Sequence, residues 1–333
     1  MSLEFIEGFD HYTTTSFPGR KWDTGSTVNA IVAGRFSGNA VRSGTGFLQI
    51  SLSSVQTRVA GFAFLFDASG ATVVCQFQDA GTTQVELRLD SSRHLVVTRN
   101  GTVLTTGTTV LALSIWYYIE FKAKIDPSTG TYEVRLNGAV EISGSGNTRN
   151  TTNSTCNQFA LRPGFSNHYF DDIYVLNTTG PPNSDFLGEC RIHTTLPNAD
   201  NTTATGTNKT WTPSTGTNHS ALVDETNPND DTDYISSATA GEIDTFQFPD
   251  ISPTGTIAGV QAVLCDRKDD AGARTLCAEY RSGAGTNYDG GTSITPGSAY
   301  LMHRQIWETD PATSAAWTAA NINAGEFGVK CVA

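Results

Sequence analysis

The chain has 333 residues, of which 38% are hydrophobic and 16% are charged, and its formal net charge is −12 at pH 7. This length is sufficient for two domains of ordinary size. Binding to nucleic-acid phosphates depends on clustered Lys and Arg side chains, so the negative balance argues against DNA, RNA and anionic membrane surfaces as partners.

No run of 18 apolar residues occurs, so we predict no membrane-spanning helix and no membrane insertion. The first residues, MSLEFIEGF, are acidic and lack the basic and apolar regions of a secretory signal peptide. We therefore expect the protein to be made in a cytoplasm, where cysteines usually stay reduced. Cys265 and Cys277 lie in neighbouring predicted strands and could pair if the finished protein meets oxidising conditions.

Short strands follow one another through the first half of the chain. Residues 3–12 form a first strand with apolar residues on both faces, and 59–66 is a continuous apolar run of buried-strand length. Residues 84–89 alternate strictly, and Asn100-Gly101 predicts a tight hairpin. Strands that recur every 8–12 residues are typical of a sandwich or jelly roll.

The stretch from Ile115 to Ile142 predicts a three-stranded antiparallel meander. Residues 115–125 alternate between an apolar face and a face that carries Tyr118, Glu120 and two lysines. Asn137-Gly138 is the strongest short hairpin signal in the chain. A sheet with one apolar face must bury that face against a second layer.

Three segments of the first half resemble the concanavalin A-like (laminin-G-like) sandwich family. They are EGFD near the N-terminus, WYYIEFK from Trp116 with a hairpin that ends in VRLNG, and the closing FDDIYV from Phe170. The resemblance implies an all-β fold: a concanavalin A-like jelly-roll sandwich over residues 1–178, with the closing strand beside the first strand. It implies no particular activity, because the fold is shared by lectins, glucanases and structural modules.

The remainder of the chain reads as a linker, 179–189, and a second, smaller β-sandwich domain, 190–333. We expect a strand over 186–196, a polar loop over 197–220, later strands near 242–248, 256–265, 274–280, 300–308 and 326–332, and a short helix capped by Thr318. The phrases DDTDYIS and the ending ETDPATSAAWTAANINAGEFGVK resemble virion proteins of tailed bacteriophages.

Catalytic constellations are missing from the sequence, so we predict no catalytic residues, no bound cofactor, and a protein that is not an enzyme. Glucanases of this fold carry a Glu-x-Asp-x-x-Glu strand, whereas Glu120 and Asp126 here have the wrong spacing. Asp171 and Asp172 are consecutive, so a strand would point them to opposite faces. The histidines show no metal-ligand spacing.

Two candidate binding features remain. Asp224, Asp230, Asp231 and Asp233 lie in an acidic segment that could supply oxygen ligands to Ca²⁺, although a solvated acidic turn explains the same residues. Trp116 and Tyr118 are candidates for contact with a ligand or partner, because at least one ring of Trp116–Tyr118 should face outward.

The sequence predicts a structural component of a tailed-phage particle, located in the virion as a capsid decoration, neck or collar, or tail-associated protein. It would act by assembly with other virion proteins and as a homo-oligomer. The alternative is a carbohydrate- or host-receptor-binding module on the virion, which would contact a host-surface glycan. A glycan hydrolase is disfavoured by the carboxylate pattern.

Overall fold

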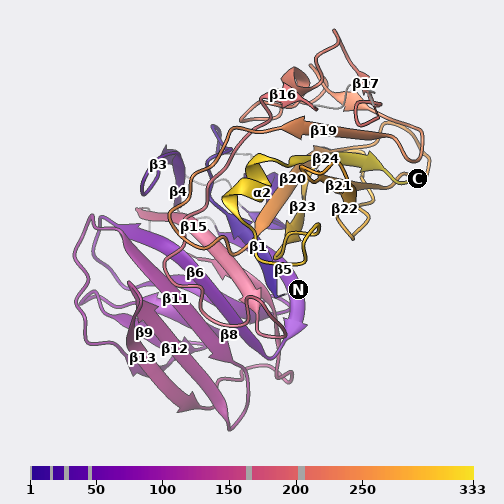
Figure 1. The fold of residues 1–333 in the computed structure, drawn as a ribbon. Coiled ribbons are helices and arrows are strands. Elements are labelled where there is room, and N and C mark those ends of the chain that lie inside the picture. Colours follow the sequence, from indigo (N-terminus) through magenta and orange to yellow (C-terminus); the bar gives the residue numbers. More distant parts are fainter. Residues whose placement is uncertain (1, 16–17, 26–29, 44–46, 163–166, 202–206) are drawn as a thin grey trace. The chain divides into compact units, whose positions relative to one another are not determined.

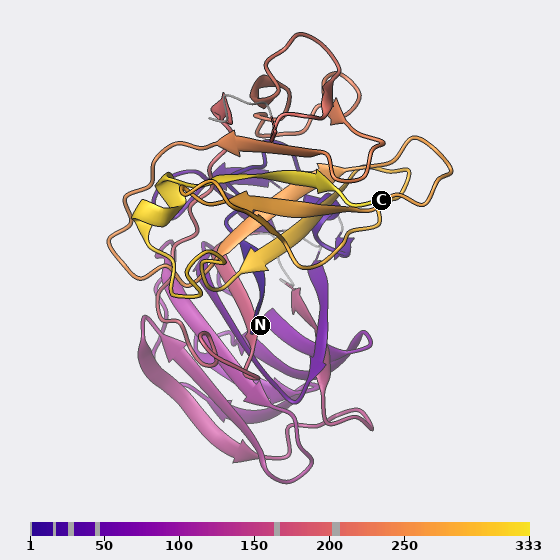
Figure 2. The same ribbon diagram turned by 45° about the vertical axis from the view of Figure 1, so that its right-hand side comes forward.

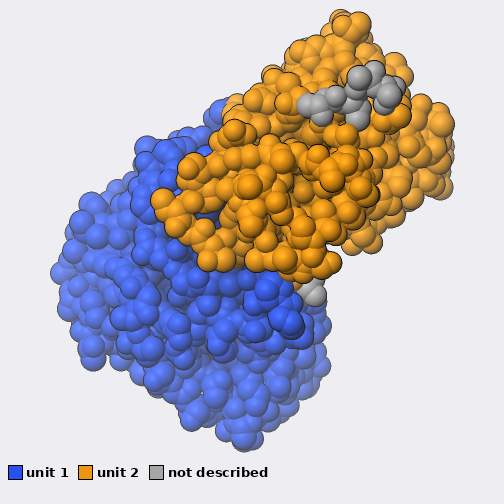
Figure 3. Space-filling view, viewed as in Figure 1, with its two compact units in different colours: residues 1–193 blue, residues 194–333 orange. Residues whose placement is uncertain are grey.

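The computed structural model describes residues 2–15, 18–25, 30–43, 47–162, 167–201 and 207–333. The chain divides into two compact units, residues 1–193 and 194–333 (Figure 3). Among the described residues, no helix is both long and apolar enough to cross a membrane. Both units are built from strands, which confirms the all-β prediction (Figure 1).

Unit 1 is a sandwich of two antiparallel sheets. Sheet A has the order β13-β12-β11-β6-β15-β4-β3, with β1 also paired to β15. Its strands are β1 (Leu3–Glu7), β3 (Ala30–Ala33), β4 (Asn39–Ser43), β6 (Thr57–Phe66), β11 (Tyr117–Lys124), β12 (Gly130–Leu136), β13 (Ala139–Gly146) and β15 (His168–Asn177). The pairing of β1 with β15 confirms that the closing strand returns beside the first.

Sheet B has the order β10-β9-β8-β7-β14-β5-β2. Its strands are β2 (Thr24–Gly25), β5 (Leu48–Val55), β7 (Thr72–Asp79), β8 (Thr82–Leu89), β9 (Leu95–Arg99), β10 (Thr102–Thr106) and β14 (Cys156–Leu161). A four-residue helix, α1 (Pro18–Lys21), precedes β2.

The core of unit 1 lies between the two sheets. Phe77 on β7 stacks on Phe121 of β11, with ring centroids 4.9 Å apart, and Phe159 of β14 packs beside Phe77. All three side chains are fully buried. Alternation along each strand therefore turns the neighbours of these rings toward the outer faces of the sheets.

The hairpin predictions in this unit are confirmed. Asn137 and Gly138 join β12 to β13, and Asn100 and Gly101 join β9 to β10; all four residues have positive φ. Two successive residues of positive φ define the type I′ turn, whose twist matches that of the flanking strands. Ile115 lies outside this regular part, because β11 begins at Tyr117, and its side chain is half exposed.

The segment predicted as a strand over 186–196 forms none, so that prediction is wrong. It crosses the outer face of sheet A instead: Gly188 N–H donates to Glu120, and Ile192 N–H donates to Asp172. The Phe186 ring lies under the Arg135 guanidinium, 4.0 Å from it. The backbone N–H groups of this segment therefore bond to side chains of sheet A and not to a neighbouring strand. The first unit accordingly extends to residue 193.

Unit 2 contains a five-stranded sheet, sheet C, in the order β16-β19-β24-β21-β22, and two pairs, β17-β18 and β20-β23. The strands are β16 (Ala199–Asp200), β17 (Thr212–Pro213), β18 (Ile235–Ser236), β19 (Ile243–Gln247), β20 (Val260–Asp266), β21 (Leu276–Arg281), β22 (Asn287–Asp289), β23 (Leu301–Trp307) and β24 (Glu326–Cys331). A 3₁₀ helix, η1 (Ser220–Leu222), follows β17.

The core of unit 2 lies between sheet C and the β20-β23 pair. Tyr280 and Phe327 of sheet C meet Trp307 of β23 and Trp317, whose indole N–H donates to the Trp307 carbonyl. The helix α2 (Ala319–Asn323) leads directly into β24 (Figure 2). Thr318 accepts a hydrogen bond from Asn321 N–H, which confirms the predicted cap.

We predict that Gly61→Ala destabilises unit 1. A Cβ at Gly61 on β6 would lie 2.1 Å from Cε1 of Tyr174, a buried ring whose hydroxyl donates to Glu120. Overpacking of this kind lowers the free energy of unfolding by about 1–3 kcal/mol. The matched control is Gly180→Ala, where the nearest atom is 3.9 Å away. Denaturant unfolding of the two variants should differ by that amount, and equal midpoints would contradict the packing argument.

Candidate functional site

The outer face of sheet B carries an unusual density of polar side chains. Because Phe77 points into the core, Gln76 and Gln78 on the same strand point outward. The strand register places Glu86 of β8 opposite Gln76, and Thr98 of β9 opposite Glu86. Side chains from three strands thus form one row across the sheet.

Glu86 is the centre of a continuous hydrogen-bond network in this row. Its carboxylate accepts from Gln76 Nε2 at 2.7 Å, from Thr98 Oγ1 at 2.7 Å and from Arg88 at 3.0 Å. Gln78 Nε2 in turn donates to Gln76 Oε1 at 2.7 Å. Every side chain in the network is therefore held in a defined orientation before any ligand arrives.

Arg162 and an aromatic ring add a second cation to the Arg88 guanidinium of this network. Arg162 follows β14 and lies 4.5 Å from the Phe47 ring, which precedes β5. Ala160 of β14 is paired with Gln76, so alternation along the chain places Arg162 on the face that carries Gln76. Arg88, beside Glu86, keeps 33% of its side chain exposed. Guanidinium groups at fixed positions suit carboxylate recognition.

The loop over 147–155 lies against one end of this face. Gln84 donates to Thr151 and to the carbonyl of Asn153, and its own oxygen accepts from Asn150 N–H. Asp79 accepts from the Thr151 hydroxyl and from the Asn153 amide. The side-chain bonds from two strands hold this loop at the β7–β8 end of the polar face.

One of the two ring residues selected from the sequence does not have the expected position. Tyr118 is fully buried, and its hydroxyl donates to the Asp172 carbonyl at 3.2 Å. The ring cannot contact a ligand, because residues 186–192 cover this part of sheet A. Trp116 is partly exposed and precedes β11.

The carboxylates weighed for catalysis hold structural positions. Asp126 accepts from Ser128 N–H and Thr129 N–H, and these hydrogen bonds lower its pKa to about 2. Glu120 is buried and accepts from Tyr174 and Gly188. The two residues therefore stabilise a turn and the covering segment.

Asp171 and Asp172 do not point to opposite faces, which corrects the sequence prediction. The pairing of β15 with β6 shifts between Asp171 and Tyr174, and Asp172 has φ of +51°. Both carboxylates are buried. Burial raises the pKa of Asp171 to about 7, with a further contribution from Asp172, and burial raises the pKa of Asp172 to about 6.

In the acidic segment proposed for Ca²⁺, Asp233 and Asp224 lie near Glu225, whose pKa is raised by burial and by these two carboxylates. Asp231 accepts from Arg267 and from the Tyr300 hydroxyl, which lower its pKa. Within the described part of the chain, the group of three His, Cys, Asp or Glu ligands that lies close together is elsewhere, at Cys277, Glu279 and Asp289. Asp224, Asp230 and Asp233 are not part of it.

No family model and no curated protein matches the chain. The matching solved structures include an endo-β-1,4-glucuronan lyase from the fungus Trichoderma reesei, with 14% identity and a TM-score of 0.38, over 47% of this chain and 91% of the lyase.

Two further matches have similar scores. Alginate lyase Aly36B, in a mutant form with alginate tetrasaccharide, is 9% identical with a TM-score of 0.37, over 52% of this chain and 96% of the lyase. A sialidase is 7% identical with a TM-score of 0.40, over 53% of this chain and 19% of the sialidase. The chain thus spans a small part of the sialidase, and at these identities the likeness concerns the fold.

These matches correct the expectation that the chain is not an enzyme. The solved structures that match it include a glucuronan lyase, an alginate lyase and sialidases. The virion role stays a prediction, since the matches do not bear on it.

We predict that Asp172→Asn weakens the pH dependence of stability. The folded chain holds protons on Asp171 and Asp172 up to pH values of about 7 and about 6, whereas an unfolded Asp titrates near pH ~4. The free energy of unfolding should therefore fall as the pH rises from about 4 to about 7. The substitution removes one carboxylate and the charge that raises the pKa of Asp171.

Denaturant titrations at several pH values between these limits measure this effect. The amide introduced by Asp172→Asn would still offer a carbonyl oxygen to Ile192 N–H, so the covering segment should stay in place. The control Asp269→Asn changes an exposed carboxylate and should reproduce the wild-type slope. An Asp172→Asn slope equal to that of the wild type would contradict the coupling.

Proposed function

We propose that unit 1 binds an oligosaccharide that carries carboxylate groups, on the outer face of sheet B. The observation that supports this most directly is the hydrogen-bonded row of Gln76, Glu86 and Thr98, flanked by Arg88 and Arg162. Binding sites combine a few fixed polar groups with apolar or aromatic surface.

The groups on this face can be matched to the carboxylate and the ring of a sugar acid. Gln76, Gln78 and Glu86 are themselves buried, so this row holds Arg88 in place through Glu86. The partly exposed groups that can reach a ligand are Arg88, Arg162 and Phe47. The Phe47 ring supplies apolar surface beside Arg162.

The charge of this face supports a carboxylate-bearing ligand. The protein has a net charge of −12, so an anionic polymer is repelled by most of its surface. Arg88 and Arg162 place two guanidinium groups near the polar row, and only one carboxylate, Glu86, lies in that row. A guanidinium pairs with a carboxylate through two parallel hydrogen bonds, which fixes orientation as well as position.

We predict that Arg88→Ala and Arg162→Ala each weaken binding of an acidic oligosaccharide by about tenfold to a hundredfold, the range expected for a lost charged hydrogen bond. Calorimetry with oligouronates and with neutral oligosaccharides of equal length measures the affinity. Mass spectrometry of the same samples shows whether the saccharide is cleaved. Lys124→Ala, on sheet A, is the matched control and should bind as the wild type does.

Two results would overturn this proposal. One is the absence of binding by the wild-type chain to every oligosaccharide of a broad glycan array. The other is binding that Lys124→Ala weakens as much as Arg88→Ala does, because a general loss of positive charge would then explain the effect. Raised salt should weaken binding of the acidic ligand and leave a neutral ligand unaffected.

Assembly into a virion, in the tail, neck or capsid surface, is the second candidate function, and one surface of unit 1 favours it. Val103, Val110 and Val140 each keep more than half of the side chain exposed. Val103 lies on β10 and Val140 on β13, and these edge strands lie next to each other. Glu141 accepts from Thr109 N–H, which holds the loop of Val110 beside β13. Exposed apolar side chains at strand edges are suited to subunit contact.

If this valine surface joins subunits, Val140→Lys should shift the solution mass toward the monomer. Light scattering over a range of protein concentrations measures that mass. Val140→Thr, which has nearly the same shape, is the control and should shift it less. A wild-type protein that stays monomeric at all concentrations would contradict the assembly function and leave saccharide binding unaffected.

A further inference from the structure

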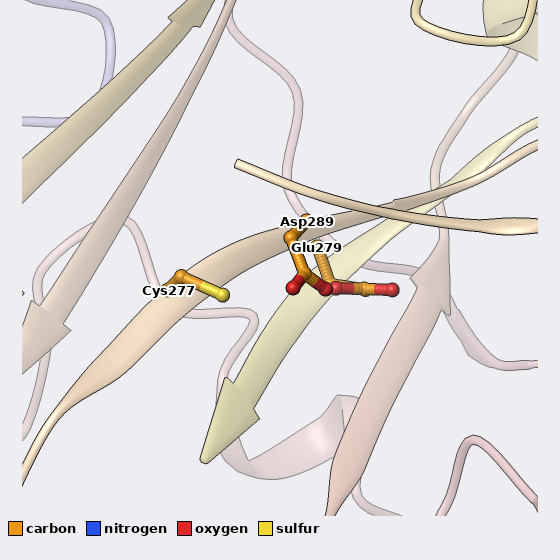
Figure 4. Close-up of side chains that lie close together, drawn as sticks. All are labelled: Cys277, Glu279 and Asp289. Carbon is orange, nitrogen blue, oxygen red and sulfur yellow. The ribbon is translucent and has the colours of Figure 1, made fainter. Parts of the chain in front are cut away.

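Three potential metal ligands meet on one face of sheet C. Cys277 and Glu279 are two residues apart on β21, so both point to the same side. Asp289 of β22 is paired with Glu279 in the strand register. The ligand atoms of the three side chains all lie within 4.8 Å of one another, and Figure 4 shows both carboxylates on the side toward which the sulfur points.

This face is opposite to the core of unit 2. Ala278 and Tyr280, the alternate residues of β21, belong to the core cluster with Phe327. Asn208 lies over the face opposite to the core, where its amide donates to Thr245 at 3.3 Å and to Asn287 at 2.8 Å. Cys277 and Glu279 are consequently buried, although they lie outside the hydrophobic core.

Glu279 lacks the partners that a buried carboxylate normally has. Its exposure is 0%, and no N–H or O–H group of the described residues donates to either carboxylate oxygen. The neighbour within hydrogen-bond reach is the Asp289 carboxylate, which can bond to Glu279 only through a shared proton. A buried charge without compensation is strongly unfavourable. Lys330, the nearest cation, gives its hydrogen bonds to Asp289, at 2.7 and 3.0 Å. Something else must therefore neutralise Glu279.

We propose that Cys277, Glu279 and Asp289 bind a divalent transition-metal ion, with Zn²⁺ as the best match. A thiolate selects zinc over magnesium or calcium, and Asp and Glu oxygens are also zinc ligands. The remaining coordination position would be taken by water. This site is independent of the saccharide face in unit 1.

The three side chains need to move only slightly to coordinate one zinc ion. Ligand atoms around one tetrahedral zinc lie roughly 3.6 Å apart, given Zn–S of about 2.3 Å and Zn–O of about 2.1 Å. The side chains must therefore approach by about 1 Å. Asp289 is exposed at the edge strand β22 and can rotate, while β21 holds Cys277 and Glu279 in place. Binding would release the Cys277 proton.

A shared proton is the competing explanation for the same cluster. Burial and the neighbouring Asp289 carboxylate raise the pKa of Glu279 to about 8, so a proton could satisfy this side chain at neutral pH. The two explanations differ in what they predict for added metal. The metal-site explanation requires the Cys277 thiol as a ligand, whereas the shared-proton explanation does not involve it.

The experiment titrates the full chain, after treatment with a chelator, with Zn²⁺ and separately with Mg²⁺. We expect one equivalent of Zn²⁺ to bind by calorimetry and to raise the melting temperature, with no effect of Mg²⁺. Cobalt(II) in place of zinc should give a sulfur-to-metal charge-transfer band. Cys277→Ser should abolish that band, and Glu279→Gln and Asp289→Asn should each weaken zinc binding at least tenfold.

Matched controls separate this site from other thiols and carboxylates. Cys265→Ser and Asp270→Asn change the same residue types elsewhere in unit 2 and should bind zinc as the wild type does. The proposal is overturned if zinc does not bind, or if Cys277→Ser retains the charge-transfer band. The shared proton is the correct explanation if two results are found together. The wild-type chain does not bind zinc, and the Glu279→Gln variant is more stable than the wild type.

Discussion

The stacking of Phe77 on Phe121 is the contact on which the arrangement of unit 1 depends. The two rings join sheet B to sheet A at the centre of the sandwich, and both are fully buried. Because side chains alternate along a strand, this contact also decides which residues of β7 face outward. The polar row on sheet B is therefore a direct consequence of how the core is packed.

Alternation of side chains along a strand also decides which residues of sheet C in unit 2 face away from the core. Tyr280 and Ala278 turn toward Phe327 in the core, which leaves Cys277 and Glu279 on the opposite face. In both units, one face of a sheet is fixed by hydrophobic packing and the other gathers polar groups from adjacent strands. The faces differ in chemistry, because sheet B presents amides and guanidinium groups, whereas sheet C presents a thiol and carboxylates.

The covering of sheet A explains why the two outer faces of the sandwich are not equivalent. The segment 186–192 donates backbone hydrogen bonds to Glu120 and Asp172, and these carboxylates, together with Tyr118, are buried beneath it. Side chains that resemble a binding site in the sequence thus hold a connecting segment in place. On sheet B the polar row is also buried, but Arg88 at its end keeps 33% of its side chain exposed, and saccharide binding is proposed there.

The sequence by itself determined the local structure: the all-β class, the Asn-Gly hairpins and the Thr318 cap all follow from alternation and turn chemistry over a few residues. It also predicted the return of the closing strand beside the first, through a family resemblance. Only the tertiary structure brought Gln76 to Glu86, or Glu279 to Asp289, because strand register and partner choice are set by packing between distant segments. For the same reason, the bulge at Asp171 and the burial of Tyr118 could not be read from local patterns.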